Sequence, residues 1–200
     1  MIIGVYGAGQ FVLSVNREIP FIAVDGGILS LKQLNITPTY VVGDFDSSNG
    51  INTNQYQNVI QLPCRKDFSD TEVAIQYAIE LGYDEIELYG VTGGRLDHFY
   101  AISRLLVKYK NIKITVFDNL NKIYLLHPGN HIICKSNYDY ISFYAVTSSH
   151  LTLKGVEYPL NSYLLEFDNA LCLSNEIKED YCEVINDTII YCIQSKKGDF

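Results

Sequence analysis

The sequence predicts an α/β fold: an N-terminal doubly wound, mostly parallel sheet with helices on both faces, followed by a C-terminal antiparallel β-sandwich. Short Val- and Ile-rich runs alternate with helical patterns over residues 1–120. Most of these runs lack polar alternation, which is typical of strands buried on both faces of a parallel sheet. Over residues 121–200, short alternating runs between turn residues favour a small sandwich. We therefore predict two domains, 1–120 and 121–200.

Strands and helices should alternate through the first domain. The strands are expected at Ile2–Tyr6, Phe21–Asp25, Tyr40–Gly43, Val59–Leu62, Glu85–Tyr89 and Lys113–Phe117. The helices are expected at Gly27–Leu34, Asp70–Leu81 and Leu96–Tyr109. Strand, helix and strand in series imply right-handed crossovers, which make the sheet doubly wound.

The predicted helix at Asp70–Leu81 carries signals at both ends. Ser69 is expected to be its N-cap, and Glu72 three positions later completes a capping-box pattern. Gly82 is expected just past its end, where a left-handed residue stops a helix.

The second domain should consist of strands alone. They are expected at Lys122–Leu126, His131–Lys135, Asp139–Val146, Leu151–Lys154, Ser162–Phe167, Cys182–Asn186 and Thr188–Gln194. Turn residues such as Pro128-Gly129-Asn130 and Asn186-Asp187 separate them.

Composition narrows the class of protein. A net charge of −8 argues against nucleic acid as a partner, because binding a phosphate backbone needs clustered Lys and Arg. No run approaches the ~18 apolar residues of a membrane span, and no basic region precedes the first apolar run, so we expect a cytoplasmic protein without a membrane partner. The five cysteines are scattered and contain no Cys-x-x-Cys pair, which favours reduced structural thiols.

Acidic side chains lie in short Gly-rich turns behind four of the predicted strands. The turns are Asp25-Gly26-Gly27, Gly43-Asp44-Phe45-Asp46-Ser47, Asp67-Phe68-Ser69-Asp70 and Gly93-Gly94-Arg95-Leu96-Asp97-His98. The carboxyl ends of parallel strands meet at one edge of a sheet, so this edge should collect up to six carboxylates. Crowded carboxylates repel one another unless a cation lies among them. An all-oxygen site favours Mg²⁺, and Mg²⁺ commonly brings a polyphosphate.

Individual residues suggest how such a site could work. Asp44 and Asp46 are two positions apart, so in extended backbone both side chains could reach one metal ion. Gly93 and Gly94 would let the backbone approach a phosphate, and Arg95 offers a planar fork for its oxygens. Lys66 is a second candidate cation.

Simpler interpretations stand beside these. A single Asp behind a strand is usually a turn or cap residue, and Arg95 could pair with Asp97 as well as with a phosphate. His98 is expected to be structural at a helix start. The segment Gly4-Val-Tyr-Gly7-Ala-Gly9 lacks the third glycine of a dinucleotide fingerprint and predicts only a tight turn.

Together these segments resemble bacterial thiamine pyrophosphokinase. Their order and spacing agree across residues 1–120, and the resemblance continues through Leu153–Leu160 and Leu173–Glu176, so it covers nearly the whole chain. Two positions depart from the family pattern: Ser69 replaces the usual Thr, and Lys66 stands where Gln is frequent.

The resemblance implies a homodimeric, Mg²⁺-dependent enzyme with thiamine and ATP as substrates. The β,γ-pyrophosphoryl group of ATP would pass to the thiamine hydroxyl, leaving AMP. The first domain would bind ATP and carry the catalytic residues. The sandwich would bind thiamine near a subunit interface, to which both domains contribute.

The resemblance also implies roles for individual residues. Asp44, Asp46 and Asp70 would bind the metal and act in catalysis together with Arg95, and Asp70 could also orient or deprotonate the thiamine hydroxyl. ATP and its phosphates would contact Asp25, Gly26, Lys66, Asp67, Ser69, Gly93, Gly94 and Arg95. Thiamine would contact Asp97, Ser174 and Asn175. Because the chain has no Trp, a Tyr or Phe must stack on the thiamine ring.

Three alternatives stay open. A pterin pyrophosphokinase could share the motifs of the first domain, although the residues after Leu153 favour thiamine. A Mg²⁺-dependent phosphohydrolase would release phosphate without an acceptor. A non-catalytic thiamine- or nucleotide-binding module would tolerate loss of carboxylates, whereas here every acid of the motifs is present.

Overall fold

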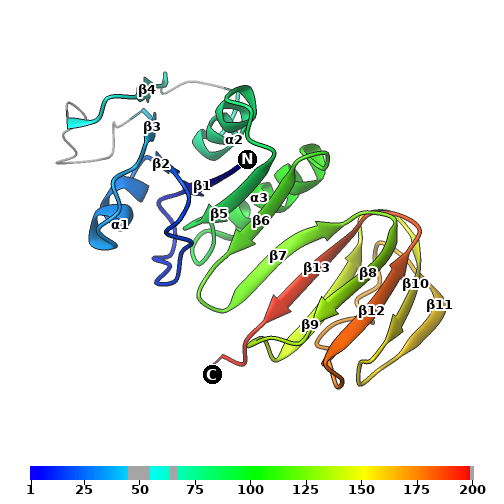
Figure 1. Ribbon diagram of the computed structural model, residues 1–200. Helices are drawn as coiled ribbons and strands as arrows, with labels where there is room; N and C mark the ends of the chain where they lie inside the picture. Colours follow the sequence, from blue (N-terminus) through cyan, green and yellow to red (C-terminus); the bar gives the residue numbers. More distant parts are fainter. Residues whose placement is uncertain (45–54, 64–66, 199–200) are drawn as a thin grey trace. The chain divides into compact units, whose positions relative to one another are not determined.

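Residues 1–44, 55–63 and 67–198 are described by a computed structural model of the chain. The chain divides into two compact units, Met1–Asn119 and Leu120–Phe200 (Figure 1). Asp46 and Lys66, two of the predicted site residues, lie outside the described residues.

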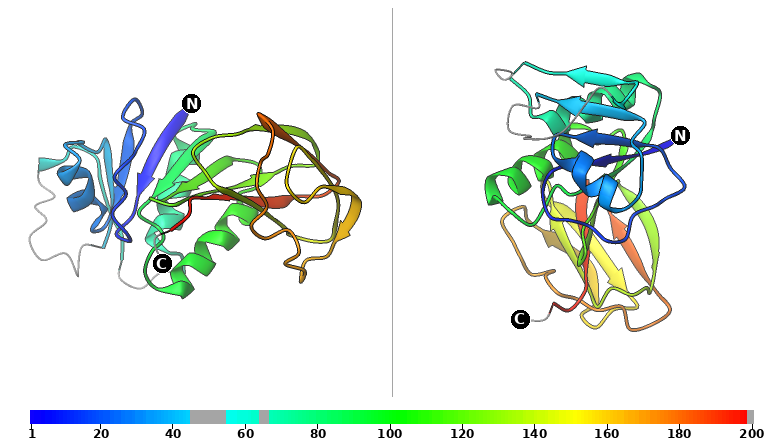
Figure 2. Two further views of the ribbon diagram at one scale, coloured as in Figure 1. Left: turned by 90° about the horizontal axis from the view of Figure 1, so that it is seen from below. Right: turned by 90° about the vertical axis from the view of Figure 1, so that its left-hand side faces the viewer.

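A parallel sheet forms the centre of the first unit, with its strands in the order β4-β3-β2-β1-β5-β6. The strands are β1 (Ile2–Tyr6), β2 (Phe21–Val24), β3 (Tyr40–Gly43), β4 (Val59–Gln61), β5 (Glu85–Tyr89) and β6 (Lys113–Phe117). The blue-to-cyan strands β1 to β4 lie one beside the next (Figure 2). All four residues of β2 are buried, as expected for a strand covered on both faces.

The helices α1 (Gly27–Gln33), α2 (Asp70–Glu80) and α3 (Leu96–Lys108) connect these strands. The connection from β2 through α1 to β3 moves toward one edge of the sheet, whereas the connections through α2 to β5 and through α3 to β6 move toward the other edge. Right-handed crossovers therefore place α1 on one face and α2 and α3 on the opposite face. The predicted doubly wound sheet is confirmed, and its predicted elements differ from the observed ones by one residue at most.

The ends of α2 confirm part of the prediction and correct another part. Ser69 Oγ accepts a hydrogen bond from the Glu72 amide at 3.2 Å, so Ser69 is the N-cap. At the other end Gly82 has φ +87, and Tyr83 N donates to Ala78 O at 3.1 Å, which closes a Schellman motif. The capping box is wrong in its second half, because the Glu72 carboxylate turns toward α3 and accepts from Lys108 and Tyr109.

The second unit is built from two antiparallel sheets, and its described residues contain no α-helix. One sheet has the order β7-β13-β9 and the other β11-β10-β12-β8. The strands are β7 (Asn121–Leu126), β8 (Gly129–Cys134), β9 (Tyr140–Ala145), β10 (Ser149–Lys154), β11 (Leu160–Leu165), β12 (Tyr181–Asn186) and β13 (Ile190–Ser195). Side chains from both sheets, among them Phe143 and Leu153, fill one core. The predicted β-sandwich is confirmed.

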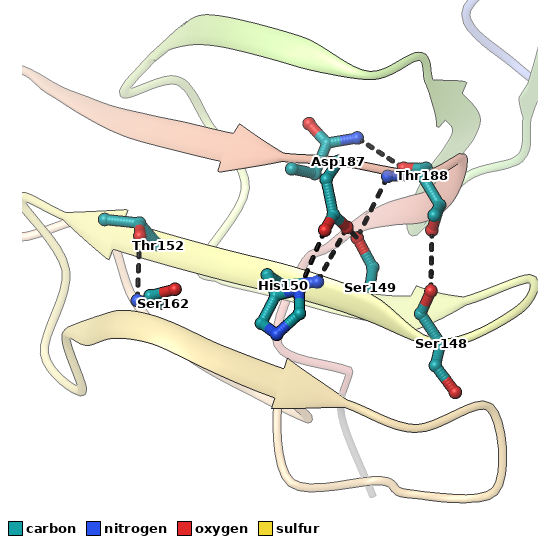
Figure 3. Close-up of polar contacts among 8 residues, drawn as sticks. Ser148, Ser149, His150, Thr152, Ser162, Asp187 and Thr188 are labelled. Atoms are coloured by element: carbon teal, nitrogen blue, oxygen red, sulfur yellow. Dashed lines mark hydrogen bonds and ion pairs between the residues drawn. The ribbon is translucent and has the colours of Figure 1, made fainter.

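A polar cluster fixes the turn from β12 to β13, where the chain passes from one sheet to the other (Figure 3). Asp187 accepts from Ser149 Oγ at 3.0 Å and from His150 N at 2.7 Å, and it lies 2.8 Å from His150 Nδ1. Thr188 Oγ1 donates to Ser148 O at 3.1 Å. A nucleophilic triad requires a serine bonded to the imidazole, whereas here the serine and the imidazole both bond to the carboxylate, so the cluster is structural.

The cysteines that the structure describes are not paired in disulfides. Cys134, Cys172, Cys182 and Cys192 are free thiols. Burial raises the pKa of Cys182 to about 11, which keeps this thiol protonated and unreactive. Within the described part of the chain, no helix has the length and apolar character needed to cross a membrane.

Candidate active site

A cleft of about 370 Å³ opens at the carboxyl ends of β1, β2 and β5. Strand order reverses between β1 and β5, and ligands of open α/β sheets bind at such a switch point. Its walls include Gly7–Gly9, Asp25, Ser69–Thr71, Gly94–Arg95, His98 and Ile102. Segments far apart in the sequence therefore converge on one cavity.

The segment Gly7–Gly9 forms one wall of this cleft, and backbone hydrogen bonds hold it and the following Gln10 against the chain after β5. Gly7 N donates to Tyr89 O at 2.8 Å, Gly9 N to Gly90 O at 2.7 Å, and Gln10 N to Thr92 O at 2.9 Å. The pairing of β1 with β5 thus continues beyond both strands. Sequence reasoning predicted only a tight turn here and missed Gly7 and Gly9 as residues of the site.

Asp25 directly follows β2 and lines the cleft in a strained conformation. Its φ is +47, a left-handed value that costs a non-glycine residue about 1 kcal/mol or more. Its amide donates to Val42 O at 3.0 Å, which ties the end of β2 to the neighbouring β3. Gly26 follows as the N-cap residue of α1. Because such strain persists only where surrounding structure enforces it, Asp25 is a strong functional candidate.

Three further aspartates of the predicted site, Asp44, Asp67 and Asp70, lie in different surroundings. Asp44 directly follows β3 and is half-buried, whereas Asp67 is exposed in the turn before α2. Asp70 is the first residue of α2, is half-buried and lines the cleft. The unpaired amides and the dipole of a helix N-terminus favour negative charge there. Asp70 therefore lines the cavity from the N-terminus of a helix.

Arg95 and Asp97 form a two-bonded pair at the mouth of the cleft. Arg95 Nη2 lies 2.6 Å from Asp97 Oδ2, and Arg95 Nε lies 3.1 Å from Asp97 Oδ1. This bonding to Arg95 holds the pKa of Asp97 below its ordinary value. The predicted ion pair is present, and the 72 % exposure of the Arg95 side chain leaves it accessible to a phosphate.

The Gly-Gly turn before α3 depends on glycine at one position in particular. Gly93 has φ +77, and a Cβ atom there would lie 2.4 Å from the Gln10 side chain. Gly94 has open space around it and lines the cleft. His98 is exposed and also lines the cleft.

In the second unit, Asn175 borders an apolar cavity of about 320 Å³ lined by Tyr158, Leu160, Leu171, Cys172, Leu173 and Asn175. Asn175 is only 3 % exposed. Its Nδ2 donates to Tyr158 O at 2.9 Å, and its Oδ1 accepts from Tyr158 N at 3.0 Å and from Glu176 N at 2.9 Å. Asn175 therefore fastens the backbone of Tyr158, whose ring is exposed beside the cavity. Ser174 is exposed and has φ +56.

The carboxylates of the first unit are oxygen donors at neighbouring strand ends. Among the described residues, no three His, Cys, Asp or Glu side chains are gathered closely enough to hold a metal ion unaided. Asp25 and Asp70 share the cleft, and Asp44 follows the strand beside β2. Such hard oxygen donors suit Mg²⁺, which commonly completes its coordination with waters and substrate phosphates.

The fold and this cleft define a two-part protein, in which an α/β unit carries a ligand cleft at the switch point of its sheet and a β-sandwich follows. A family model described as the catalytic domain of thiamin pyrophosphokinase matches residues 13–117, and a model described as its vitamin B1 binding domain matches residues 130–189. The chain belongs to the thiamine pyrophosphokinase family. The predictions of this family and of an enzyme, a thiamine diphosphokinase, are confirmed.

Individual relatives in sequence and in structure support the same family. The chain is 37% identical to thiamine pyrophosphokinase of Bacillus subtilis over 170 residues, which are 78% of each chain. A crystal structure of the Bacillus subtilis enzyme matches with a TM-score of 0.90 and 31% identity, over 99% of this chain and 100% of that one. The structure of the Geobacillus thermodenitrificans enzyme matches with a TM-score of 0.87 and 28% identity, over 100% and 99%.

Proposed function

We propose that this enzyme transfers the β,γ-pyrophosphoryl group of ATP to the hydroxyl of thiamine in a Mg²⁺-dependent reaction that leaves AMP. The observation that carries the proposal is the switch-point cleft, where Asp25, Asp70, Gly94 and Arg95 line one cavity. This combination of carboxylates, a glycine turn and a guanidinium suits a metal-bound polyphosphate. Pyrophosphoryl transfer depends mainly on positioning and charge neutralisation, which such a set can supply.

The phosphates would be held by the turn before α3 and by the side chains near α2. Gly93 and Gly94 bring the backbone close to a ligand, and Arg95 supplies two parallel donors. A polyphosphate would compete with Asp97 for Arg95. When ATP binds, Arg95 would exchange the Asp97 carboxylate for phosphate oxygens. Lys66, Asp67 and Ser69 complete the proposed ATP contacts, with Asp25 and Gly26 across the cleft.

Asp44, Asp46 and Asp70 would hold Mg²⁺. When bound, the ion neutralises phosphate charge and orients the transferred group. Asp70 has a second proposed task, because its carboxylate faces the cavity and can accept a hydrogen bond from the attacking hydroxyl. The Asp70 carboxylate would thereby orient the hydroxyl and receive its proton.

Thiamine would be bound through the second unit. Tyr158 offers an exposed ring beside an apolar cavity, so we propose it as the aromatic that stacks on the thiamine ring system. Asn175 supports this ring by fixing its backbone, and Ser174 next to it is exposed for contact with the aminopyrimidine. Asp97 would contribute from the first unit. The net charge of −8 is compatible with a cationic thiazolium substrate.

The assembly and the location of the enzyme complete the proposal. Leu96 and Tyr100, on the first turns of α3, are 82% and 66% exposed, which leaves apolar surface uncovered in a single chain. This supports a homodimer. We also propose a cytoplasmic location, in keeping with the buried free thiols of the sandwich core.

The choice of acceptor tests the proposal against its nearest rival, a pterin pyrophosphokinase. The protein is incubated with Mg-ATP and either thiamine, a hydroxymethylpterin or no acceptor. We expect a diphosphate ester with thiamine alone. Transfer to the pterin would favour the rival, and phosphate release without an acceptor would indicate a hydrolase. Thiamine binding without turnover would indicate a binding module.

A further inference from the structure

A polar cluster joins the C-terminal end of α3 to the first turns of α2. Lys108 Nζ donates to Glu72 Oε1 at 2.5 Å, and the Tyr109 hydroxyl donates to the same oxygen at 3.0 Å. Gln76 Nε2 donates in turn to the Tyr109 hydroxyl at 2.9 Å. The proposed chemistry uses none of these side chains, so their arrangement requires an explanation of its own.

Lys108 also contacts the segment on the other side of Asp70. Its Nζ lies 5.2 Å from the centroid of the Phe68 ring, within the range of a cation–π interaction. Phe68 stands two positions before Asp70, and Glu72 stands two positions after it. One ammonium group therefore holds both flanks of the turn whose middle residue lines the cleft.

The contact with Glu72 is partly shielded from water. The Glu72 side chain is 11% exposed, whereas the Lys108 side chain is 50% exposed. A carboxylate that loses most of its hydration needs a counter-charge and hydrogen bonds to compensate. Removing the ammonium would take away the counter-charge, and Glu72 would then be driven toward water together with the first turn of α2.

We propose that Lys108 is a positioning residue that holds the Asp70 carboxylate in its working orientation, an inference that rests on the proposed transfer reaction. Lys108 itself touches no substrate in this account. Its ammonium fixes Phe68 on one side and Glu72 on the other, and these contacts limit how the backbone between them can move. The Ser69 cap does not involve Lys108, so we expect α2 to stay folded when Lys108 is changed.

The test compares Lys108→Met, which keeps the length of the side chain, with Lys108→Arg, which keeps its charge. With thiamine and Mg-ATP, Lys108→Met should lower kcat about tenfold, because small misplacements of a reacting group are costly. It should also raise the Mg²⁺ concentration needed for half-maximal rate, while the KM for thiamine stays within about twofold. Lys108→Arg should keep at least about half of the wild-type kcat.

Lys113→Met is the matched control. Lys113 Nζ lies 2.6 Å from Glu85 Oε1, and both residues begin strands at the end of the sheet opposite the cleft. This control should keep its kcat. Equal losses of kcat in Lys108→Met and Lys113→Met would show a general effect of losing a surface ion pair and would overturn the proposal.

Amide hydrogen exchange gives a second readout that does not depend on turnover. Exchange in residues 67–73 should become faster in Lys108→Met, return to the wild-type rate in Lys108→Arg and stay unchanged in Lys113→Met. Unchanged exchange in Lys108→Met would overturn the inference. A wild-type protein without transferase activity, combined with faster exchange in Lys108→Met, would instead overturn the proposed function while supporting the contact between Lys108 and the Asp70 turn.

Discussion

At the scale of single residues, the proposed chemistry depends most on Asp70. It begins α2, where the helix dipole favours a carboxylate, and it lines the same cleft as Asp25 and Arg95. Asp25 adds strain at the end of a buried strand, with φ +47. The two acids therefore reach the cleft by different means, one from a helix start and one from a left-handed turn.

Replacing Asp70 by Asn tests its role directly. Asp70→Asn keeps the shape of the side chain but removes the charge and the ability to accept a proton, so kcat should fall about a hundredfold or more. Steady-state kinetics with saturating thiamine and Mg-ATP measure the effect. Glu80→Gln, at the opposite end of the same helix, serves as the control and should keep its kcat. A folded Asp70→Asn enzyme with nearly normal kcat would contradict the proposed role.

The sequence predicted which residues form the site better than it predicted which groups those residues contact. Asp25, Asp70 and Arg95 could be placed in one site from the sequence, because each follows a strand end and such ends share an edge. The wall at Gly7–Gly9 was not predictable, since it depends on pairing with Tyr89 and Gly90 far along the chain. Sequence spacing also says nothing about whether a site side chain is already engaged, as Asn175 is by the backbone of Tyr158 and Glu176.

At the scale of elements, α2 shows where local sequence is sufficient. The Ser69 cap and the Gly82 end were both predictable, because each depends on residues within one turn. The Glu72 half of the capping box failed because Lys108, 36 residues later, offers the carboxylate a charged partner. A charged tertiary partner outcompetes a backbone amide that water can also satisfy.

The cap at Ser69 gives a stability prediction. Ser69→Ala should lower the free energy of unfolding by about 1 kcal/mol, because the Glu72 amide loses its acceptor. Ser69→Thr, the residue usual in the family, should leave stability within about 0.5 kcal/mol of wild type. Urea unfolding followed by circular dichroism measures both. Equal stabilities of the Ala and Thr variants would show that the hydroxyl does not cap the helix.

At the scale of the whole molecule, the change in the hydrophobic pattern along the chain predicted the architecture of both units. Unbroken apolar runs in the first unit and alternating runs in the second correspond to buried parallel strands and a sandwich. The strand order itself was not predictable from periodicity. The cleft position follows from that order, because the switch between β1 and β5 exists only once the chain has returned past its first strand.

The central claim is that this molecule moves two phosphoryl groups together onto thiamine. Phosphorus NMR of a reaction containing the protein, Mg-ATP and thiamine follows every phosphorus species at once. We expect AMP and thiamine diphosphate to appear in equal amounts and at equal rates, with no signal from ADP. Formation of ADP with thiamine monophosphate, or of free phosphate in place of the ester, would contradict the account.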